Sequence, residues 1–251
     1  MKTLFLILAF TANCSLFFAQ GIDDEIIVDE PWDTHFSLGR TPEGEILTVA
    51  ACVADSTRIY LYDMADRSIA FFDTAGKFIN KINLESIGRA TYVGDDFVVR
   101  KNNAIFINTV DKRLEYYNLS DGSREKSLQY PYDYFKDEFP ERNRRIINRI
   151  FLDQENILLG NSHALFDFNE PGLAKRSRSQ KIMRSPPNKQ ILFYDSRKPV
   201  IKESGSVHWK GKKFRMRQSH FPLLGKSIAI SGEKLITCTI NNNGVQIFRT
   251  R

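Results

Sequence analysis

The sequence has few of the residues and motifs that mark common catalytic sites. It contains 4 His and 3 Cys in 251 residues. No two of the histidines (His35, His163, His208 and His220) stand at the spacing of metal ligands. A Gly-x-Ser-x-Gly nucleophile turn, a glycine-rich phosphate loop and a calcium-binding loop are all missing. We therefore expect no metal site and no cofactor, and the sequence favours a protein that is not an enzyme.

Long hydrophobic runs are confined to the first twenty residues. The segment 1–20, MKTLFLILAFTANCSLFFAQ, has a positive start at Lys2, an apolar run and an Ala-Gln ending before an acidic stretch. This pattern predicts a secretory signal peptide that is cleaved after Gln20. A membrane anchor is disfavoured, because polar residues interrupt the run and it is shorter than the ~20 residues of a membrane span. The chain that remains, 21–251, is expected to be a single domain, secreted or periplasmic, without a transmembrane segment.

The three cysteines leave two alternatives open. Cys14 would allow lipoprotein processing, but Thr-Ala-Asn is a poor match to the residues expected before such a cysteine, and more apolar sequence follows it. Cys52 and Cys238 remain after cleavage, and in an exported chain they could form one disulfide. We favour two separate buried thiols, because each cysteine lies in an apolar strand pattern.

The segment 58–84, RIYLYDMADRSIAFFDTAGKFINKINL, predicts three consecutive β-strands. They cover residues 59–62, 68–72 and 77–82, each an aromatic or β-branched run bounded by Asp or Gly turns. Aromatic residues make up 12% of the chain and hydrophobic residues 42%. The composition therefore favours a packed, sheet-rich core over disorder or a helical bundle.

Copies of this unit recur along the chain. Residues 105–118 (IFINTVDKRLEYYN) and 235–249 (LITCTINNNGVQIFR) repeat the strand–turn–strand pattern, and 156–169 is a weaker copy. Each copy follows a shorter apolar stretch that suits an inner strand. Four short antiparallel strands at a period in the forties predict a β-propeller blade. We predict an all-β propeller of five or six four-stranded blades, starting near Ile26 or at Glu45, with 190–217 as a degraded blade.

The pattern I/V-Y-x-x-D…R-I-x-x-F-D-x-x-G-K-F at 59–82 resembles the NHL-type and related six-bladed β-propellers of exported bacterial proteins. The resemblance implies the fold and carries no catalytic residue with it. Aspartates and asparagines that recur with the blade (Asp63, Asp66, Asp73, Asn108, Asp111 and Asn118) are expected to bond the turn backbone. Channel carboxylates that bind calcium, as in some propeller hydrolases, are the less favoured interpretation.

Two insertions interrupt the repeat, and they hold the candidate binding residues. Segment 130–149 is rich in aromatic side chains, and 171–189 is rich in Pro, Ser and basic residues. Residues 175–217 carry 14 Lys and Arg against 2 Asp and Glu, whereas the whole chain has 36 against 30. The remainder of the chain is therefore net acidic. The candidate binding residues are Lys175, Arg176, Arg178, Lys181, Arg184, Tyr132, Tyr134 and Trp209.

This distribution predicts a monomeric, non-enzymatic binding or scaffold protein. A basic block can attract a polyanion, and exposed aromatics can stack on sugars or anchor a protein. We expect a protein or polysaccharide partner, such as an acidic glycan of the cell envelope, and no nucleic acid in an exported setting. The alternatives are a hydrolase or lyase in the central channel, and a structural domain that has lost its activity. The basic block could also be a solvated edge that discourages strand pairing.

Overall fold

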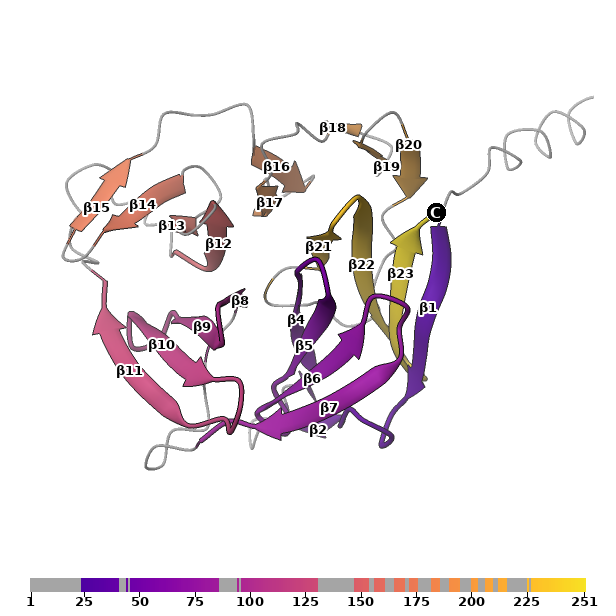
Figure 1. Ribbon diagram of the computed structural model, residues 1–251, viewed down its shortest axis with the longest axis horizontal. Coiled ribbons are helices and arrows are strands. Elements are labelled where there is room, and N and C mark those ends of the chain that lie inside the picture. Colours follow the sequence, from indigo (N-terminus) through magenta and orange to yellow (C-terminus); the bar gives the residue numbers. More distant parts are fainter. Residues whose placement is uncertain are drawn as a thin grey trace, which may run out of the picture.

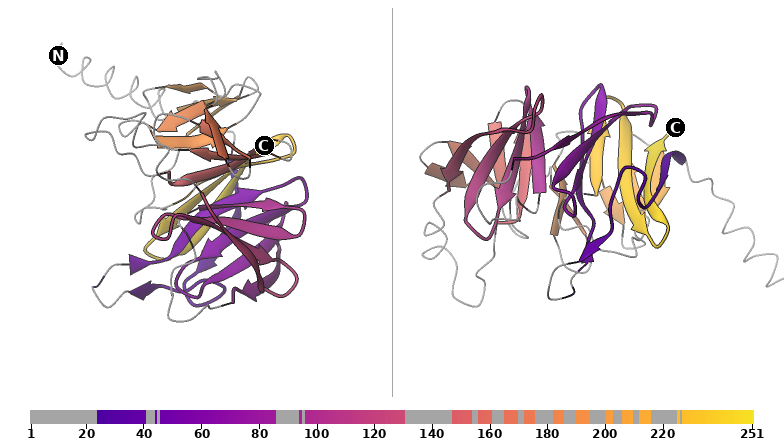
Figure 2. Two further views of the ribbon diagram at one scale, coloured as in Figure 1. Left: turned by 90° about the vertical axis from the view of Figure 1, so that its left-hand side faces the viewer. Right: turned by 90° about the horizontal axis from the view of Figure 1, so that it is seen from below.

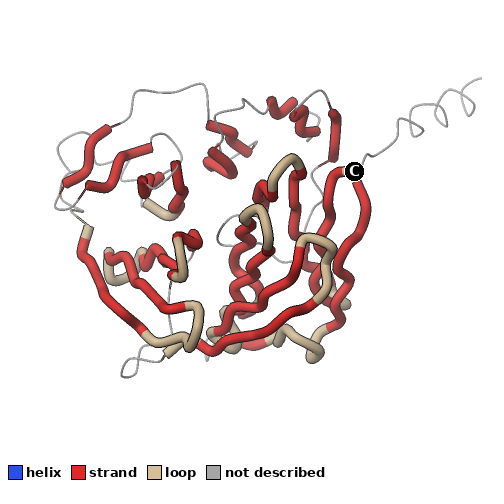
Figure 3. Tube along the Cα trace, viewed as in Figure 1, coloured by secondary structure: helices blue, strands red, loops and turns tan. Residues whose placement is uncertain are grey.

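The computed structural model describes residues 24–40, 44, 46–85, 94, 96–130, 147–153, 156–160, 165–169, 172–175, 182–185, 190–194, 200–202, 206–209, 212–215, 225 and 227–251. From 169 to 224 it describes the course of the strands only. These residues form strands, turns and loops, with no helix among them (Figure 3). The strands group into sheets arranged around a centre (Figure 1), and the chain is an all-β propeller.

Four sheets of the described chain have four strands. Blade 1 contains β4 (Val49–Ala54), β5 (Arg58–Asp63), β6 (Ser68–Asp73) and β7 (Phe78–Asn83). Blade 2 contains β8 (Asp96–Arg100), β9 (Asn103–Asn108), β10 (Arg113–Asn118) and β11 (Arg124–Gln129). Blade 3 contains β12 (Arg149–Asp153), β13 (Asn156–Gly160), β14 (Leu165–Asn169) and β15 (Gly172–Lys175). The closing blade contains β21 (Ile228–Ser231), β22 (Lys234–Asn241), β23 (Gly244–Thr250) and β1 (Asp24–Pro31).

Smaller sheets complete the described strands. They are the pair β16 (Ile182–Ser185) and β17 (Gln190–Tyr194), the sheet β18 (Val200–Lys202), β19 (Ser206–Trp209) and β20 (Lys212–Arg215), and the hairpin β2 (Gly39–Arg40) and β3 (Ile46–Leu47). The innermost strands are neighbours in a closed circle: β4 with β8, β8 with β12, β12 with β17, β17 with β21, and β21 with β4. The single degraded blade predicted at 190–217 is not seen as such: the segment is divided between two sheets, because β17 pairs with β16 and β18 to β20 form a sheet of their own.

The N-terminal strand β1 closes the ring, and the sequence did not predict this. We expected the first blade to start near Ile26 or at Glu45, but β1 pairs antiparallel with β23 from Asp24 opposite Thr250 to Pro31 opposite Gly244. It is the outer strand of the closing blade, and blade 1 has its inner strand at 49–54. Figure 2 shows β1 beside the C-terminal strands. Strand periodicity reveals that a segment is extended, but pairing across the whole chain leaves no local signal.

Both faces of blade 1 are buried, because it stands between two other blades. Side chains alternate along a strand, so Ile59 and Leu61 of β5 pack toward the closing blade, while Tyr60 and Tyr62 pack toward blade 2. Burial of both faces explains why the sequences of β5 and β6 are nearly continuous apolar runs. We call the first interface the closing seam and the second the sequential seam.

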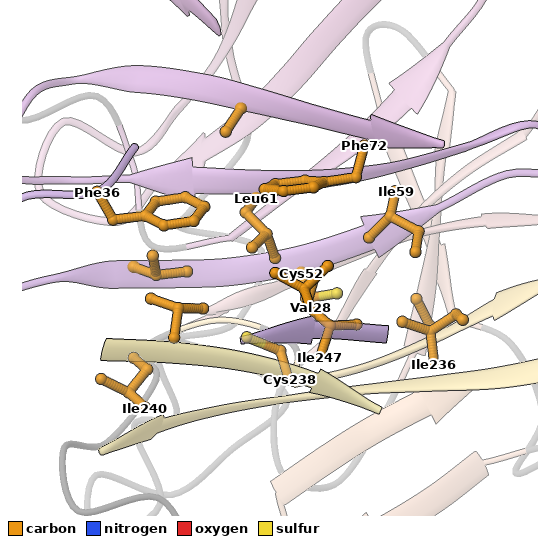
Figure 4. Close-up of a cluster of buried hydrophobic side chains, with 14 residues drawn as sticks. Val28, Phe36, Cys52, Ile59, Leu61, Phe72, Ile236, Cys238, Ile240 and Ile247 are labelled. Atoms are coloured by element: carbon orange, nitrogen blue, oxygen red, sulfur yellow. The ribbon is translucent and has the colours of Figure 1, made fainter. Parts of the chain in front are cut away.

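The two seams differ in composition. The closing seam is mainly aliphatic; its buried side chains include Val28, Val49, Cys52, Ile59, Leu61, Phe72, Ile236, Cys238, Ile240 and Ile247 (Figure 4). The sequential seam is aromatic; its buried side chains include Tyr60, Tyr62, Ile69, Phe71, Phe97, Phe106 and Tyr117. The ring of Phe106 stacks on Phe97 with centroids 5.0 Å apart and meets Tyr62 edge-on at 4.8 Å. Burial of each such ring contributes about 2–3 kcal/mol.

A glycine at the same blade position makes the closest approach across each seam. Gly76, in the β6–β7 turn, has a φ of +89°, and a Cβ there would lie 1.9 Å from the carbonyl oxygen of Ile27 in β1. Gly122, in the β10–β11 turn, has a φ of +76°, and its Cβ would lie 1.9 Å from the carbonyl oxygen of Asn83 in β7. Each turn therefore fits beneath the outer strand of the preceding blade only because it lacks a side chain.

Candidate functional site

The inner strands bury their charged side chains within the protein. Asp96 at the start of β8 is fully buried, and its carboxylate accepts a hydrogen bond from the Ile150 backbone amide of β12 at 3.1 Å. Arg149 is also buried and donates through Nη1 to the Asn148 carbonyl oxygen at 2.8 Å. Asp96 therefore joins two neighbouring inner strands, whereas Arg149 contacts the backbone just before its own strand. Their burial and protein partners suit blade packing better than contact with a substrate.

A group of ionisable side chains of blade 1 contacts the connection between β1 and β4. Lys81 of β7 is its centre: Nζ donates to Asp66 Oδ2 at 2.7 Å and to the His35 carbonyl oxygen at 2.7 Å, and it lies 3.7 Å from Asp63 Oδ2. Ser37 donates its amide to Asp63 Oδ2 and its hydroxyl to Asp66 Oδ2, both at 2.9 Å. We call these five residues the connector cluster.

The pKa values of the two carboxylates of this cluster are shifted in opposite directions, because their surroundings differ. Burial raises the pKa of Asp63, and the neighbouring Asp66 charge adds to the increase, against the opposing effects of the Ser37 amide and Lys81. Burial also acts to raise the pKa of Asp66, but hydrogen bonds from Lys81 and Ser37 outweigh it, so that this pKa is lowered. The cluster thus holds a paired carboxylate at the surface and a desolvated one beneath it.

The hydrogen bonds of the connector cluster indicate that it fixes the β1–β4 connection to blade 1 and does not serve catalysis. The carboxylate oxygens of the cluster accept from the amide and hydroxyl of Ser37 in the connection and from Lys81 in the outer strand. His35 adds to the docking, because its ring stacks on Phe78 at 3.7 Å and its Nδ1 lies 3.1 Å from Glu30 Oε2. In the described part of the chain, no group of three or more His, Cys, Asp or Glu could hold a metal ion.

Four of the six repeated turn residues bond the turn backbone as the sequence predicted: Asp63, Asp73, Asn108 and Asn118. The prediction was wrong for the carboxylates of Asp66 and Asp111, which bond side chains instead. In the β5–β6 turn, Asp63 Oδ1 accepts from the amides of Ala65 and Asp66. Asn108 accepts from the Asp111 amide at 2.8 Å in the matching turn of blade 2. Asn241 accepts from the two following amides in the closing blade, at 2.8 and 3.0 Å.

The predicted binding residues are spread over several elements. Lys175 ends β15 opposite Phe166, Arg184 lies in β16 opposite Ile191, and Trp209 ends β19 opposite Lys212. Figure 1 shows these strands following one another along the upper arc of the ring. The other predicted binding residues, Arg176, Arg178, Lys181, Tyr132 and Tyr134, lie outside the described residues, as do positions 131–146 of the insertion predicted at 130–149. The binding role of all eight stays a prediction.

Cys52 and Cys238 lie on the two sides of the closing seam. Cys52 belongs to β4 and Cys238 to β22, and both are buried in one cluster of apolar side chains (Figure 4). Both are present as thiols. Burial raises the pKa of the Cys238 thiol well above its ordinary value, and the negative charge of an ionised Cys52 adds to the increase. The sequence favoured two separate buried thiols, and a bridge between them stays the untested alternative.

Arg249 joins three elements at the closing seam, a contact that no local sequence pattern predicts. From β23 it reaches Glu25 of β1, with Nε to Oε1 at 3.0 Å, although the two residues stand 224 positions apart. It also donates to the Thr74 carbonyl oxygen in the β6–β7 turn of blade 1. Arginine provides several donors in a fixed fork, so that one side chain can hold two acceptors.

Comparison with known proteins supports the propeller fold. A family described as "6-bladed beta-propeller" matches residues 42–140, which is less than half of the chain. No curated protein matches the sequence. Among the described residues, no helix is long and apolar enough to cross a membrane.

Solved structures with similar folds come from several kinds of protein. An exported protein of Bacteroides fragilis has a TM-score of 0.40 and 14% identity, over 88% of this chain and 74% of that one. BamB of Moraxella catarrhalis has a TM-score of 0.35 and 10% identity, over 83% and 74%. Glutaminyl cyclase of Myxococcus xanthus has a TM-score of 0.37 and 10% identity, over 91% and 95%. Similarity at this level carries no argument about activity or partner.

Proposed function

We propose that this chain is an exported propeller with NHL-type repeats that binds a cell-envelope or extracellular partner without catalysis. Its ligand is an acidic glycan or an acidic protein surface. The export part rests on the signal-peptide pattern of residues 1–20 and places the mature chain outside the cell or in the periplasm. We expect that chain to be a monomer.

One observation carries the proposal: Lys and Arg are concentrated in residues 175–217, where they far outnumber Asp and Glu, while the rest of the chain is net acidic. The strands of this part of the chain, β15 to β20, span Gly172 to Arg215 and follow one another along one arc of the ring (Figure 1). Concentration of one sign of charge raises the local potential and attracts a polyanion. A Lys- and Arg-rich edge would also discourage strand pairing, so the binding experiment has to separate these two roles.

The side chains of the described inner strands favour binding over catalysis. A hydrolase or lyase in the central channel would need acidic or histidine side chains that converge on the channel mouth. Asp96 and Arg149 instead contact neighbouring backbone within the protein. The channel enzyme therefore remains the alternative, with no observation in the described residues that favours it.

A charge-reversal experiment tests the proposal. The mature chain is titrated with an acidic polysaccharide, polygalacturonate, and binding is measured by calorimetry at low and high salt. We expect salt-sensitive binding that is lost in the triple variant Lys175→Glu, Arg176→Glu and Arg178→Glu. Binding through exposed charges weakens as salt screens them.

The matched control reverses three exposed positive charges of blades 1 and 2: Arg58→Glu, Lys77→Glu and Lys101→Glu. This variant has the same net charge as the first, so retained binding would assign the effect to the position of the charge. Equal loss in both variants would mean that only net charge matters. Unchanged binding in the first variant would remove the basic arc from the proposal.

A further inference from the structure

The two thiols of the closing seam are placed to form a covalent closure of the ring. Cys52 lies on the innermost strand of blade 1 and Cys238 on the second strand of the closing blade. The fully buried Leu61 and Ile247 are their respective partners across the ladders β4–β5 and β22–β23. Both cysteine side chains therefore point into the same layer between the blades, and Figure 4 shows them within it.

The strands that carry the two cysteines approach each other across the seam. Stacked sheets lie ~10 Å apart, whereas the Cα atoms of a disulfide are usually ~4.4–6.8 Å apart. Blades converge toward the propeller axis, and strand β4 lies on that side. Residues of β4 and β22 come within 8 Å of one another between Cα atoms. A bridge between Cys52 and Cys238 requires their own Cα atoms to come within the disulfide range.

We propose that Cys52 and Cys238 form a disulfide that locks the closing seam of the exported protein. The oxidant is a small or protein disulfide, such as oxidised glutathione. One cysteine thiolate displaces a first glutathione thiolate and forms a mixed disulfide; the second cysteine thiolate then displaces the other. The two protein thiols lose two electrons and two protons, and two molecules of reduced glutathione leave.

Burial sets the time at which this bond forms. The thiolate is the attacking species, and burial raises the pKa of the Cys238 thiol, so little thiolate exists once the seam has closed. The bond must therefore form while the chain is folding. The inference uses export, part of the proposed function, only to supply the oxidant; it is independent of the partner.

Thiol labelling of the mature chain tests the inference. The chain is refolded in a glutathione redox buffer, unfolded in denaturant without reductant, and treated with a maleimide that adds mass to each thiol. We expect no labelling and a mass lower by two hydrogens, with both thiols labelled after reduction. Labelling of both thiols without reduction would overturn the proposal.

Two further measurements distinguish a disulfide that stabilises the closing seam from one that forms without a structural role. Oxidised protein should have an unfolding equilibrium constant about two to three orders of magnitude below that of the reduced protein. Oxidised glutathione added after folding should react far more slowly than during refolding. The double variant Cys52→Ala and Cys238→Ala provides the reference without a bond. Equal stability of the oxidised and reduced protein would contradict a locking role.

A parallel measurement of polygalacturonate binding distinguishes failure of this inference from failure of the proposed function. If the disulfide does not form but polygalacturonate still binds, only the disulfide proposal is wrong. If the disulfide forms but polygalacturonate does not bind, only the proposed binding by the basic residues is wrong.

Discussion

The two faces of blade 1 meet their neighbours under different constraints. At the sequential seam, blade 2 follows blade 1 directly in the chain, and an aromatic cluster fills the interface. At the closing seam the partner strands come from opposite ends of the sequence, and aliphatic side chains fill the interface. At the sequential seam the chain runs from one complete blade into the next, whereas at the closing seam it joins blade 1 only to β1, and the other three strands of the closing blade depend on noncovalent contacts. Those contacts include the pairing with β1 and the Arg249 side chain, and the connector cluster fixes the β1–β4 connection to blade 1.

Both seams contain a turn glycine in close contact with the outer strand of the preceding blade. The turn glycines Gly76 and Gly122 stand under the outer strand of the preceding blade at the same 1.9 Å distance from a would-be Cβ to a carbonyl oxygen. The repeat thus specifies in the same way how one blade meets the outer strand of the preceding blade at both seams. What differs is the set of polar contacts that surrounds this shared arrangement.

The largest expected effect comes from removal of β1. Deletion of residues 24–31 leaves the edge of β23 unpaired and removes Val28 from the closing seam. We expect loss of the single cooperative unfolding transition, together with aggregation through the exposed edge. Thermal unfolding followed by circular dichroism and light scattering measures both. A chain that lacks only 21–23 is the control, and identical unfolding of the two shortened chains would show that β1 does not close the ring.

Substitution of the seam glycines should have the next largest effect. Gly76→Ala and Gly122→Ala each place a Cβ against a carbonyl oxygen in a left-handed backbone conformation, and we expect each to cost about 3–4 kcal/mol of unfolding free energy. Denaturant titration measures the cost.

Gly232→Ala is the matched control for these substitutions. Its φ is +55°, but nothing lies within 4 Å of the added Cβ, so only the backbone cost of about 1 kcal/mol applies. If Gly76→Ala cost no more than this control, the turn would not be wedged against β1. A clear difference between the two seam variants would show that the chain connection matters at this position.

The connector cluster gives a smaller and pH-dependent effect. Asp66→Asn should cost about 0.5–1 kcal/mol at neutral pH, with allowance for the solvent screening of this partly exposed carboxylate. The pKa of Asp66 is lowered in the folded protein. Its contribution to stability is therefore complete above the unfolded value, near 3.8, and is lost as pH falls through the folded pKa.

Paired unfolding curves measured from pH 7 into the acid range test this dependence. The difference between wild type and Asp66→Asn should shrink toward zero at the lowest pH. Asp111→Asn, at the corresponding turn position of blade 2, is the control for the sequential seam. A difference that stays constant with pH would mean that the contribution of Asp66 does not depend on its charge.

The smallest expected effect is that of Arg249→Met. The substitution removes the contacts to Glu25 and to the Thr74 carbonyl oxygen while retaining an unbranched apolar stem. Surface ion pairs contribute little, so we expect Tm to fall by about 1–3 °C at low salt and less at high salt. Differential scanning calorimetry at two ionic strengths measures this, with Arg58→Met as an exposed control. A salt-independent loss would assign the effect to packing.

The repeat was predictable from the sequence because its signals are local. Aromatic and β-branched runs predicted strands at 59–62, 68–72 and 77–82, and the structure has β5, β6 and β7 at 58–63, 68–73 and 78–83. Recurrence of this unit predicted the propeller. The position of Asp or Asn at each turn predicted its bonds to the backbone, as seen for Asp63 and Asn108.

The closing contacts were not predictable in the same way. DEIIVDEP at 24–31 is recognisable as a strand, but nothing in it identifies β23 as its partner. His35 and Ser37 stand in a segment with no periodicity, and their partners lie in blade 1. The turn glycines had a usable signal, because Gly76 and Gly122 follow matching strands in two copies of the blade. The candidate binding residues lie where the repeat is weakest, so the repeat itself says little about them.

The pairing of β1 with β23 has a consequence for the order of events during synthesis. The first strand of the mature chain can find its partner only after the last residues are available, because Asp24 stands opposite Thr250. Contacts between such distant residues form late and slow the folding of β-proteins. Blades 1 to 3 can assemble before β1 has a partner, and we therefore expect the ring to close last.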